Sequence, residues 1–359
     1  MTTPSDEIAC RRVLSSFNAA SPDSESLWMA AKSRWAEKAA PRLTEIQSGL
    51  SGARVWRVHH GVSGWALRQW SRGAVSIDRL GELHRWIGWL VDVGRLPLAK
   101  PFVTKNGVTW LEHRGSLWQL EPWLDGEPEL RVPADSQRVS TAVTALAQLH
   151  LESARSCSTA SSRTWFSTKE GPAPAVLERI PLLANWTPSR LAAAYKQLQR
   201  LDDPVIRNAL QEIVATAGRM VPRVREQMLQ ARSVKVPLLP CLRDARPDHF
   251  LFSQHQLAGI IDPSAARTET VAADLSRLLG GYLPAGPATW SAALDDYEKH
   301  RLLTFAERQL LPVLDASNAV LSSLHWVDVC LPGAMARLSP EQGRRVLELA
   351  ERLMQLSIE

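Results

Sequence analysis

The sequence predicts an α+β fold, in which short antiparallel strands come first and mainly helices follow. Between Gly49 and Leu124, short segments of alternating apolar and polar residues are separated by glycine-containing turns, the pattern of paired antiparallel strands. From Pro133 onward, apolar residues recur at the spacing of amphipathic helices. One hairpin interrupts this helical part, with an apolar run at 250–252 as its first strand and 257–261 as its return strand.

Length and composition place the chain among globular proteins. Its 359 residues, 45% hydrophobic and 22% charged, are enough to bury one large core or two ordinary ones. The four cysteines are scattered without metal or disulfide spacing, as expected of reduced cytoplasmic thiols. The N-terminal segment lacks the apolar region of a secretory signal, and the most apolar runs are too short to span a bilayer. We therefore expect a cytoplasmic protein without a membrane partner.

The charge balance is mildly basic. A net charge of +5 fits an anionic nucleotide as well as it fits a nucleic acid. A protein that binds nucleic acid through helices would need a dense basic stripe or a stacking platform, and the sequence shows neither. We therefore expect a nucleotide partner and no nucleic-acid partner.

The first 48 residues are predicted to form an N-terminal helical extension. Residues 1–25 are polar, with a short helix around Ile8–Phe17, and are expected to form a terminal arm. The stretch Ser26–Ile46 combines helix-forming residues with two tryptophans and Leu43, which predicts a packed helix.

Glycines punctuate the segment from Gly49 to Trp70. Ser51 and Gly52 precede a first alternating strand, and a glycine turn at 61–64 leads into a second strand. Backbone N–H groups in such a turn can cover phosphate groups. Most turns of this composition are only turns, so the pattern alone does not decide between these alternatives.

A helix and a hairpin are predicted next. The segment Ile77–Val93 places Leu80, Leu83, Ile87 and Leu90 on one face. Within Phe102–Leu124, the pair Asn106-Gly107 is a strong hairpin-turn signal. Ten of the 14 tryptophans precede Leu124, which favours an aromatic core here, and only Trp123 is considered for stacking on a base.

The rest of the chain is predicted to be helical, apart from an exposed loop at Ser153–Pro174 and a short strand at Val236–Pro240. Helices are expected over Ser136–Glu152, within Ala175–Lys235, and over Leu275–Leu283, Trp290–Leu303, Phe305–Leu321 and Pro340–Ser357.

The stretch with most chemical information is Cys241–Asp274. Asp244 precedes the hairpin and Asp262 follows it, so folding the hairpin back on itself brings both carboxylates to the same end. With His249 beside them, these groups can hold a divalent cation and orient a hydroxyl group. That is the minimum a phosphoryl-transfer site needs, because proteins catalyse this reaction mainly by positioning groups and stabilising charge.

This stretch resembles the catalytic segment of the aminoglycoside phosphotransferase and choline kinase-like family, relatives of the protein kinases. The resemblance covers roughly Gly49–Asp274 and places Asp244 on the catalytic aspartate, which orients the acceptor hydroxyl. Asp262 falls on the metal-binding aspartate, and Asp274 on the aspartate that steadies the catalytic loop. His249 replaces the family's asparagine, as a metal ligand or as a hydrogen-bond partner of Asp244 only.

The resemblance implies a two-lobed, protein-kinase-like fold, with ATP and Mg²⁺ bound between the lobes. A small antiparallel-sheet lobe would cover residues 49–125. A mainly helical lobe would cover residues 126–359 and contain the catalytic loop, residues 241–274, and the acceptor pocket.

Within the small lobe, the resemblance implies a nucleotide-binding role for several residues. Ser51 and Gly52 would lie in a loop over the phosphates, and Arg68 would replace the phosphate-binding lysine, with Glu82 as its partner. The backbone between Glu121 and Trp123 would contact adenine, although the proline between them has no N–H to donate. Arginine stays charged and can grip two oxygens at once. The alternative for Arg68 is an exposed cation on a strand.

These observations predict an ATP-dependent phosphotransferase that acts on a hydroxyl group of a small molecule. The alternative is a kinase-like pseudoenzyme that binds a nucleotide or a partner without efficient transfer. Three departures favour that alternative, namely Arg68, His249 and the pair Pro263-Ser264 after the metal-binding aspartate. Three acids of the C-terminal helices either attract a cationic acceptor or are solvated: Asp295, Asp296 and Glu298.

Overall fold

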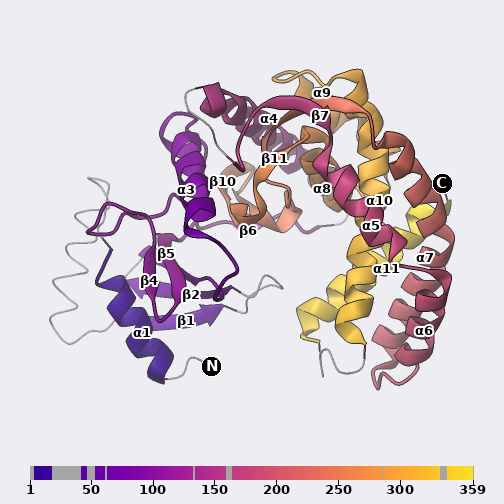
Figure 1. Cartoon of the computed structure of the whole chain (residues 1–359), viewed down its shortest axis with the longest axis horizontal. Helices are drawn as coiled ribbons and strands as arrows, with labels where there is room; N and C mark the ends of the chain where they lie inside the picture. Colours follow the sequence, from indigo (N-terminus) through magenta and orange to yellow (C-terminus); the bar gives the residue numbers. More distant parts are fainter. Residues whose placement is uncertain are drawn as a thin grey trace. The chain divides into compact units, whose positions relative to one another are not determined.

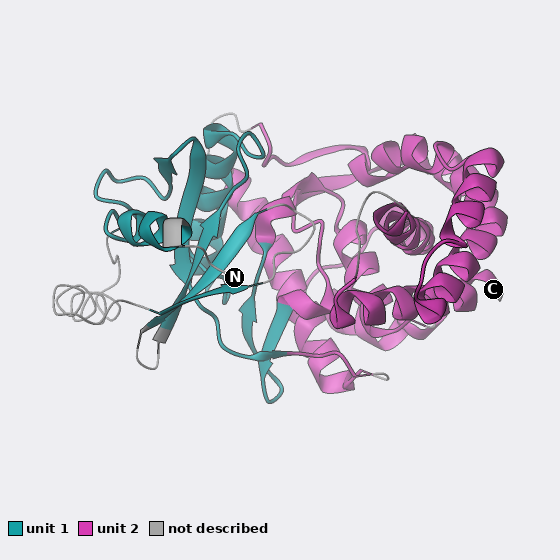
Figure 2. Ribbon diagram, turned by 90° about the horizontal axis from the view of Figure 1, so that it is seen from below, with its two compact units in different colours: residues 1–127, 250–262 teal, residues 128–249, 263–359 magenta. Residues whose placement is uncertain are grey.

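The computed structural model describes residues 4–17, 42–46, 53–60, 63–131, 134–158, 164–284, 286–331 and 338–358. The chain divides into two compact units (Figure 2). Unit 1 comprises residues 1–127 and 250–262, and unit 2 comprises residues 128–249 and 263–359. Antiparallel strands dominate unit 1 and helices dominate unit 2 (Figure 1), which confirms the predicted α+β fold. The domain boundaries predicted at residues 48 and 125 stay predictions.

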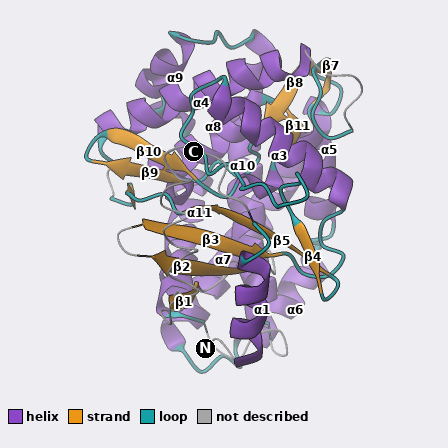
Figure 3. Ribbon diagram, turned by 90° about the vertical axis from the view of Figure 1, so that its left-hand side faces the viewer, coloured by secondary structure: helices purple, strands orange, loops and turns teal. Residues whose placement is uncertain are grey.

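Unit 1 is built on a five-stranded antiparallel sheet with the strand order β1-β2-β3-β5-β4 (Figure 3). In the centre of this sheet, Arg68 lies opposite Gln119 and Ala66 lies opposite Glu121. Because side chains alternate along a strand, Arg68, Gln119 and Glu121 share one face. The strands are β1 (Arg42–Ile46), β2 (Arg54–His60), β3 (Ser63–Gln69), β4 (Leu111–His113) and β5 (Ser116–Pro122).

The opposite face of the sheet is apolar and packs against helix α1 (Pro4–Leu14). Trp56 and Trp118 stack there with their ring centroids 5.5 Å apart. The predicted terminal arm is therefore wrong for residues 4–17, which contribute to a core. The buried cluster consists of Cys10, Val13, Leu14, Phe17, Trp56, Val58, Trp65, Leu67, Trp118 and Leu120.

Residues 42–46 form a strand rather than the end of the helix predicted over Ser26–Ile46. Their side chains alternate in exposure, and Leu43 packs against the apolar cluster. β1 pairs with β2 along its whole length. Residues 26–41 lie outside the described residues, as do Ser51 and Gly52.

Helix α3 (Ile77–Asp92) confirms the helix predicted at 77–93. The Ser76 hydroxyl accepts the N–H of Arg79 and caps its first turn. His84 is buried and contacts the Oε1 atom of Gln119 at 3.2 Å, so α3 lies over the polar face of the sheet. The four predicted core positions are buried, namely Leu80, Leu83, Ile87 and Leu90.

The predicted hairpin forms in unit 1 as β9 (Phe250–Ser253) and β10 (Gln256–Ile260). A register shift between Leu257 and Gly259 marks a bulge. The hairpin is tied to the rest of unit 1, because the N–H of Ile260 donates to the carbonyl of Pro97 at 2.8 Å. The short strand β6 (Glu127–Pro128) completes its sheet.

Unit 2 is mainly helical, as predicted. No helix in the part of the chain that the structure describes is long and apolar enough to cross a membrane. The helices are α4 (Ser136–Ser158), α5 (Pro174–Ala184), α6 (Pro188–Leu198), α7 (Pro204–Ala231), α8 (Val271–Tyr282), α9 (Ser291–Glu298), α10 (Phe305–Cys330) and α11 (Pro340–Ile358).

A small antiparallel sheet in unit 2 delivers the catalytic loop predicted from the sequence. Its strand order is β11-β8-β7, and the predicted strand at 236–240 lies within its central strand. The loop predicted at Ser153–Pro174 is partly wrong, because its first residues continue α4 and its last residues form β7. The strands are β7 (Lys169–Pro172), β8 (Lys235–Cys241) and β11 (Arg267–Glu269), and single 3₁₀ turns occupy Pro247–His249, Pro263–Ala265 and Pro287–Thr289.

Candidate functional site

The loop that follows β8 is held by one buried carboxylate. Asp274 lies in the first turn of α8, where Thr270 caps the helix, and its side chain is fully buried. Its Oδ2 accepts the N–H of Leu242 at 2.7 Å, and its Oδ1 accepts the N–H of Arg243 at 2.6 Å. Charge-assisted hydrogen bonds of this length are strong. The predicted role of Asp274 in steadying the loop is confirmed.

The side chain of His150 forms a hydrogen bond with this carboxylate. Its Nε2 lies 3.1 Å from Oδ2 of Asp274, and its Nδ1 lies 2.8 Å from the hydroxyl of Tyr297 on α9. A carboxylate only accepts, so Nε2 carries the proton and Nδ1 accepts from the tyrosine. Burial lowers the pKa of His150, which favours this neutral form. His150 lies near the end of the helix predicted over Ser136–Glu152, and no role at the site was predicted for it from the sequence.

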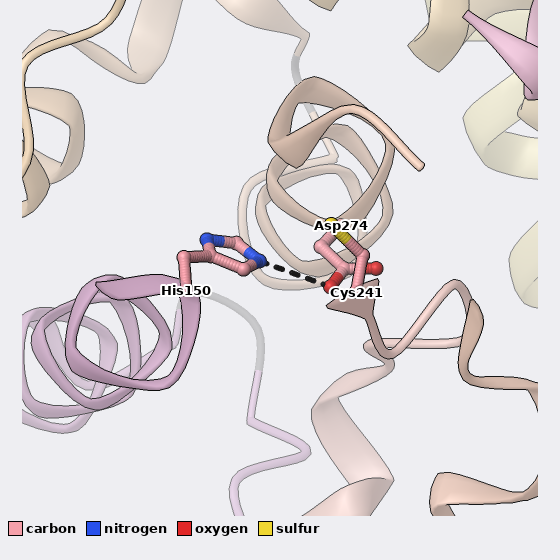
Figure 4. A group of neighbouring side chains, drawn as sticks. All are labelled: His150, Cys241 and Asp274. Carbon is pink, nitrogen blue, oxygen red and sulfur yellow. Dashed lines mark hydrogen bonds and ion pairs between the residues drawn. The ribbon is translucent and has the colours of Figure 1, made fainter. Parts of the chain in front are cut away.

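His150, Cys241 and Asp274 lie together as a buried group, with one potential ligand atom from each within 4.8 Å of the others (Figure 4). Both oxygens of Asp274 already accept backbone N–H groups. The Cys241 thiol donates to the carbonyl of Glu269 at 3.4 Å, and burial raises its pKa well above the ordinary value. A metal ion would need Cys241 as a thiolate and free lone pairs on its ligand atoms. These three residues therefore hold the loop in place and do not form a metal centre.

Asp244 projects from the loop directly after a strained residue. Arg243 has a φ of 64°, a left-handed conformation that non-glycine residues rarely adopt and that often occurs at functional sites. The Asp244 side chain is 33% exposed. Its Oδ1 accepts from Nε of Arg277 on α8 at 3.2 Å and lies 3.2 Å from Nη2 of the same guanidinium, as an ion pair. Arg277, which no sequence pattern singles out, lies about one helical turn after Asp274.

His249 is buried and uses both ring nitrogens inside the loop. Its Nδ1 lies 2.8 Å from the backbone carbonyl of Asp244, and its Nε2 lies 3.0 Å from the guanidinium of Arg246. A guanidinium only donates, so Nε2 is the acceptor and Nδ1 donates to the carbonyl. His249 was expected either to bind the metal or to form a hydrogen bond with Asp244, and the structure contains the hydrogen bond. A metal on Nε2 would have to displace Arg246, which also grips Asp248 through two hydrogen bonds.

Helix α8 approaches this loop very closely. A Cβ atom added to Gly281 would lie 2.5 Å from Cδ of Pro247, which begins the 3₁₀ turn that ends at His249. Real Cβ atoms do not come this near to other atoms. Glycine at this position therefore allows the turn to rest directly on the helix.

In unit 1, Arg68 lies between two acids. Its Nη1 is 3.3 Å from Oδ1 of Asp262, and its Nη2 is 3.8 Å from Oε1 of Glu121. Burial raises the pKa of Glu121, and Arg68 opposes that change. Asp262 follows the hairpin with a φ of 51°, so this residue also has a left-handed backbone. The predicted exposed cation is wrong, because the Arg68 side chain is only 11% exposed.

The other predicted nucleotide-binding residues have these environments. Glu82 is buried in α3, and its pairing with Arg68 stays a prediction. The N–H of Trp123 donates to the carbonyl of Gly64 at 3.0 Å, so this N–H is already used. The guanidinium of Arg57 lies over the Trp123 ring, 4.5 Å from its centroid, and occupies one side of the ring considered for base stacking.

The predicted site residues fall into two groups, one in each unit. Arg68, Glu121 and Asp262 come together in unit 1, and Asp244, His249 and Asp274 come together in unit 2. The acids considered for a cationic acceptor have local partners. Asp296 pairs with Lys299 at 2.6 Å, and Glu298 pairs with Arg308 and accepts the N–H of Leu303.

Comparison with known proteins concerns the family and the fold. The phosphotransferase enzyme family matches residues 42–313. A homoserine kinase of Granulibacter bethesdensis is 28% identical over 161 residues, which cover 42% of this chain and 50% of that protein. The chain therefore matches half the length of this curated relative.

Two solved structures establish the fold. An amicoumacin kinase in complex with AMP-PNP and Ca²⁺ has a TM-score of 0.59 at 13% identity, over 90% of this chain and 92% of that chain. A spectinomycin phosphotransferase in complex with ADP and spectinomycin has a TM-score of 0.59 at 14% identity, over 87% of this chain and 93% of that chain. At these identities the likeness concerns the fold, which confirms the predicted protein-kinase-like class.

Proposed function

Because the chain belongs to the phosphotransferase enzyme family, we propose that it transfers the terminal phosphoryl group of ATP to a hydroxyl group of a small molecule. The observation that carries this proposal is the loop after β8. Asp274 holds its backbone through two N–H groups, and a partly exposed carboxylate, Asp244, projects from it. A rigid backbone that presents an accessible carboxylate suits a reaction in which positioning is most of the catalysis.

In this proposal, Asp244 binds and orients the acceptor. Its carboxylate accepts a hydrogen bond from the acceptor hydroxyl and orients the oxygen toward the terminal phosphorus of ATP. As the new bond between this oxygen and phosphorus forms, the bond from phosphorus to the bridging oxygen of ADP breaks. The hydroxyl proton passes to Asp244, and ADP leaves with the electron pair of the broken bond.

Arg68 and Asp262 are assigned to the nucleotide phosphates and their cation. Asp262 offers carboxylate oxygens, the ligands that Mg²⁺ prefers, on a left-handed backbone that ends the hairpin. When bound, Mg²⁺ would neutralise charge on the phosphate oxygens. Arg68 contributes a guanidinium that can bind two phosphate oxygens at once and is held ready by Glu121.

His249 is assigned to the loop and not to the cation. Both of its nitrogens already have partners, and an oxygen ligand suits Mg²⁺ better than an imidazole. The hydrogen bond from Nδ1 to the carbonyl of Asp244 closes the loop on itself. In this assignment His249 replaces the family's asparagine as a structural residue.

The names of the similar proteins suggest which acceptors to try first. They include a homoserine kinase, an amicoumacin kinase and a spectinomycin phosphotransferase. A screen of ATP turnover should therefore include homoserine, amicoumacin and spectinomycin, together with other amino sugars, choline-like amines and nucleosides. Release of ADP that depends on one of these compounds would identify the acceptor class.

The proposal is tested by Asp244→Ala in the full chain. ADP release should fall by a factor of about 10³ or more, because the acceptor hydroxyl loses its orienting base. Binding of MgATP, measured by isothermal titration calorimetry, should change little. Turnover at the wild-type rate would contradict the assignment. Tight MgATP binding by a wild-type chain that turns over no acceptor, and not even water, would favour a pseudoenzyme.

A further inference from the structure

Arg277 makes an unusual set of contacts for an arginine in the interior of a helix. Its Nε donates to Oδ1 of Asp244, and its Nη2 lies 3.2 Å from the same oxygen. Its Nη1 donates to Oδ1 of Asn318 at 2.9 Å and to Oγ of Ser322 at 3.0 Å, both on α10. The side chain is 17% exposed. All three nitrogens of the guanidinium are therefore engaged, and one of its two sets of partners is uncharged.

These contacts fix the guanidinium independently of the loop. Asn318 and Ser322 lie four residues apart on α10, so they face the same direction on that helix. Burial lowers the pKa of Arg277, and the Asp244 carboxylate opposes that change. A mostly buried guanidinium loses much of its hydration, so it depends on these partners for compensation.

The consequence concerns the two oxygens of Asp244. Oδ1 is occupied by Arg277, whereas Oδ2 lies 4.0 Å from Nε of Arg246. Other charged or titratable groups near this pair are His249 in the loop, Arg179 on α5 and Arg345 on α11, and Asp248 pairs with Arg246. With Oδ1 held, rotation about the carboxyl group is restricted, and Oδ2 is the oxygen left for an acceptor hydroxyl.

Helix α8 thus provides two different anchors from one face. Asp274 and Arg277 are three residues apart, so their side chains point to the same side of the helix. Asp274 holds the backbone of the loop, and Arg277 holds the side chain that the loop presents. A loop that needed only to be stable would not require the second anchor.

We propose that Arg277 is a positioning residue for phosphoryl transfer, which holds Oδ1 of Asp244 so that Oδ2 meets the acceptor hydroxyl. The inference rests on the proposed function, since it assigns Arg277 to the same reaction. A lysine cannot reproduce the arrangement, because a single ammonium group lacks the planar fork that reaches a carboxylate and two α10 side chains together.

The test measures kcat and the KM for ATP separately in Arg277→Gln, Arg277→Lys and the wild type, as ADP release with the acceptor from the screen, or with water where none is found. Arg277→Gln should lower kcat by about 10- to 100-fold, because a misaligned base costs rate rather than nucleotide binding. The KM for ATP should stay within about twofold. Arg277→Lys should retain an intermediate kcat, because it keeps the charge without the fork.

The matched control is Arg190→Gln, which removes an arginine of the same unit whose Nη2 donates to both carboxylate oxygens of Asp328. Its kcat should equal that of the wild type. If Arg277→Gln does not fold, as judged by its thermal melting, Arg277→Lys and Ser322→Ala decide the matter, and both should lower kcat several-fold. A wild-type kcat in the folded variants, or equal changes in kcat and in the KM for ATP, would overturn the inference.

The two proposals fail in different ways. If Asp244→Ala retains full turnover, the proposed function is wrong and the role of Arg277 falls with it. If Asp244→Ala is inactive while Arg277→Gln has the wild-type kcat, the function stands and only the positioning role is wrong.

Discussion

The two groups of candidate site residues hold their acids in opposite ways. In unit 2, fully buried Asp274 is bound by two backbone N–H groups, which cannot leave without unfolding the loop. In unit 1, Asp262 is 33% exposed and faces the guanidinium of Arg68 at 3.3 Å. A guanidinium on a long side chain can move away, and a cation can take its place beside the carboxylate. Asp274 is therefore part of the scaffold, whereas the partner of Asp262 can be exchanged.

The comparison predicts its largest effect for Asp274→Ala. Two buried N–H groups and His150 would lose their acceptor, so the free energy of unfolding should fall by about 4 kcal/mol. Urea unfolding followed by tryptophan fluorescence measures this change. Asp328→Ala is the control, since its exposed pair with Arg190 should contribute less than about 1 kcal/mol. Similar losses in the two variants would contradict the scaffold role.

Glu269 is a second buried acid of unit 2, and its carboxylate has fewer hydrogen bonds than that of Asp274. Oε1 of Glu269 accepts the N–H of Thr270, whereas Oε2 has no hydrogen bond among the described residues and faces Nε of Arg243 at 3.4 Å. Burial raises the pKa of Glu269 from 4.5 to about 7, against the effects of the Thr270 N–H and Arg243. The folded state therefore binds this proton more tightly than the unfolded chain does.

This pKa gives a pH dependence with a definite sign. The contribution of Glu269 is fully present below pH 4.5 and is lost as the pH rises to about 7, with a total loss of about 3 kcal/mol. Glu269→Gln should remove that loss. The free energy of unfolding in urea, measured at pH 5, 6.5 and 8 for both proteins, isolates the difference from other titrating groups. Parallel curves for the wild type and the variant would show that Glu269 does not titrate in this range.

The smallest of the three effects on stability is expected for Asp262, the acid whose partner can be exchanged. Asp262→Ala should leave the stability of the free protein within about 1 kcal/mol, because Asp262 is partly exposed. It should instead abolish the additional stabilisation by ATP that depends on Mg²⁺, which is about 2.7 kcal/mol at a 100-fold excess over Kd. Thermal melting with ATP, with and without Mg²⁺, measures both quantities.

Asp92→Ala supplies the control for this experiment, because Asp92 is an exposed acid of unit 1 that pairs with Lys100. Its melting should respond to Mg²⁺ and ATP as the wild type does. A magnesium-dependent shift that survives in Asp262→Ala would remove Asp262 from the cation site.

The sequence was most informative where the chemistry is local. The hairpin and Asp274 lie within one stretch of 34 residues, Cys241–Asp274, so their spacing alone indicates the loop and its anchor. The contacts of Arg277 with α10 join residues about 40 positions apart, and those of Arg68 with Glu121 and Asp262 depend on the register of β3 and β5. Such contacts leave no periodic signal in the sequence.

Two errors near the N-terminus have different causes. The spacing of Cys10, Leu14 and Phe17 is that of an apolar helix face and indicates packing, whereas the polar residues around them indicate an exposed arm. At 42–46, helix-forming neighbours suggested a helix, whereas the alternation of exposed and half-buried side chains is that of a strand. Pairing with β2 overrides the local preference there.

Gly281 has a practical consequence for anyone who engineers this chain. Replacing a helix glycine with alanine usually favours the helix by about 1 kcal/mol. Here the new methyl group would strike the ring of Pro247 and push the turn away from α8. A programme of stabilising substitutions should leave this glycine in place, because a more favourable helix would come with a displaced loop.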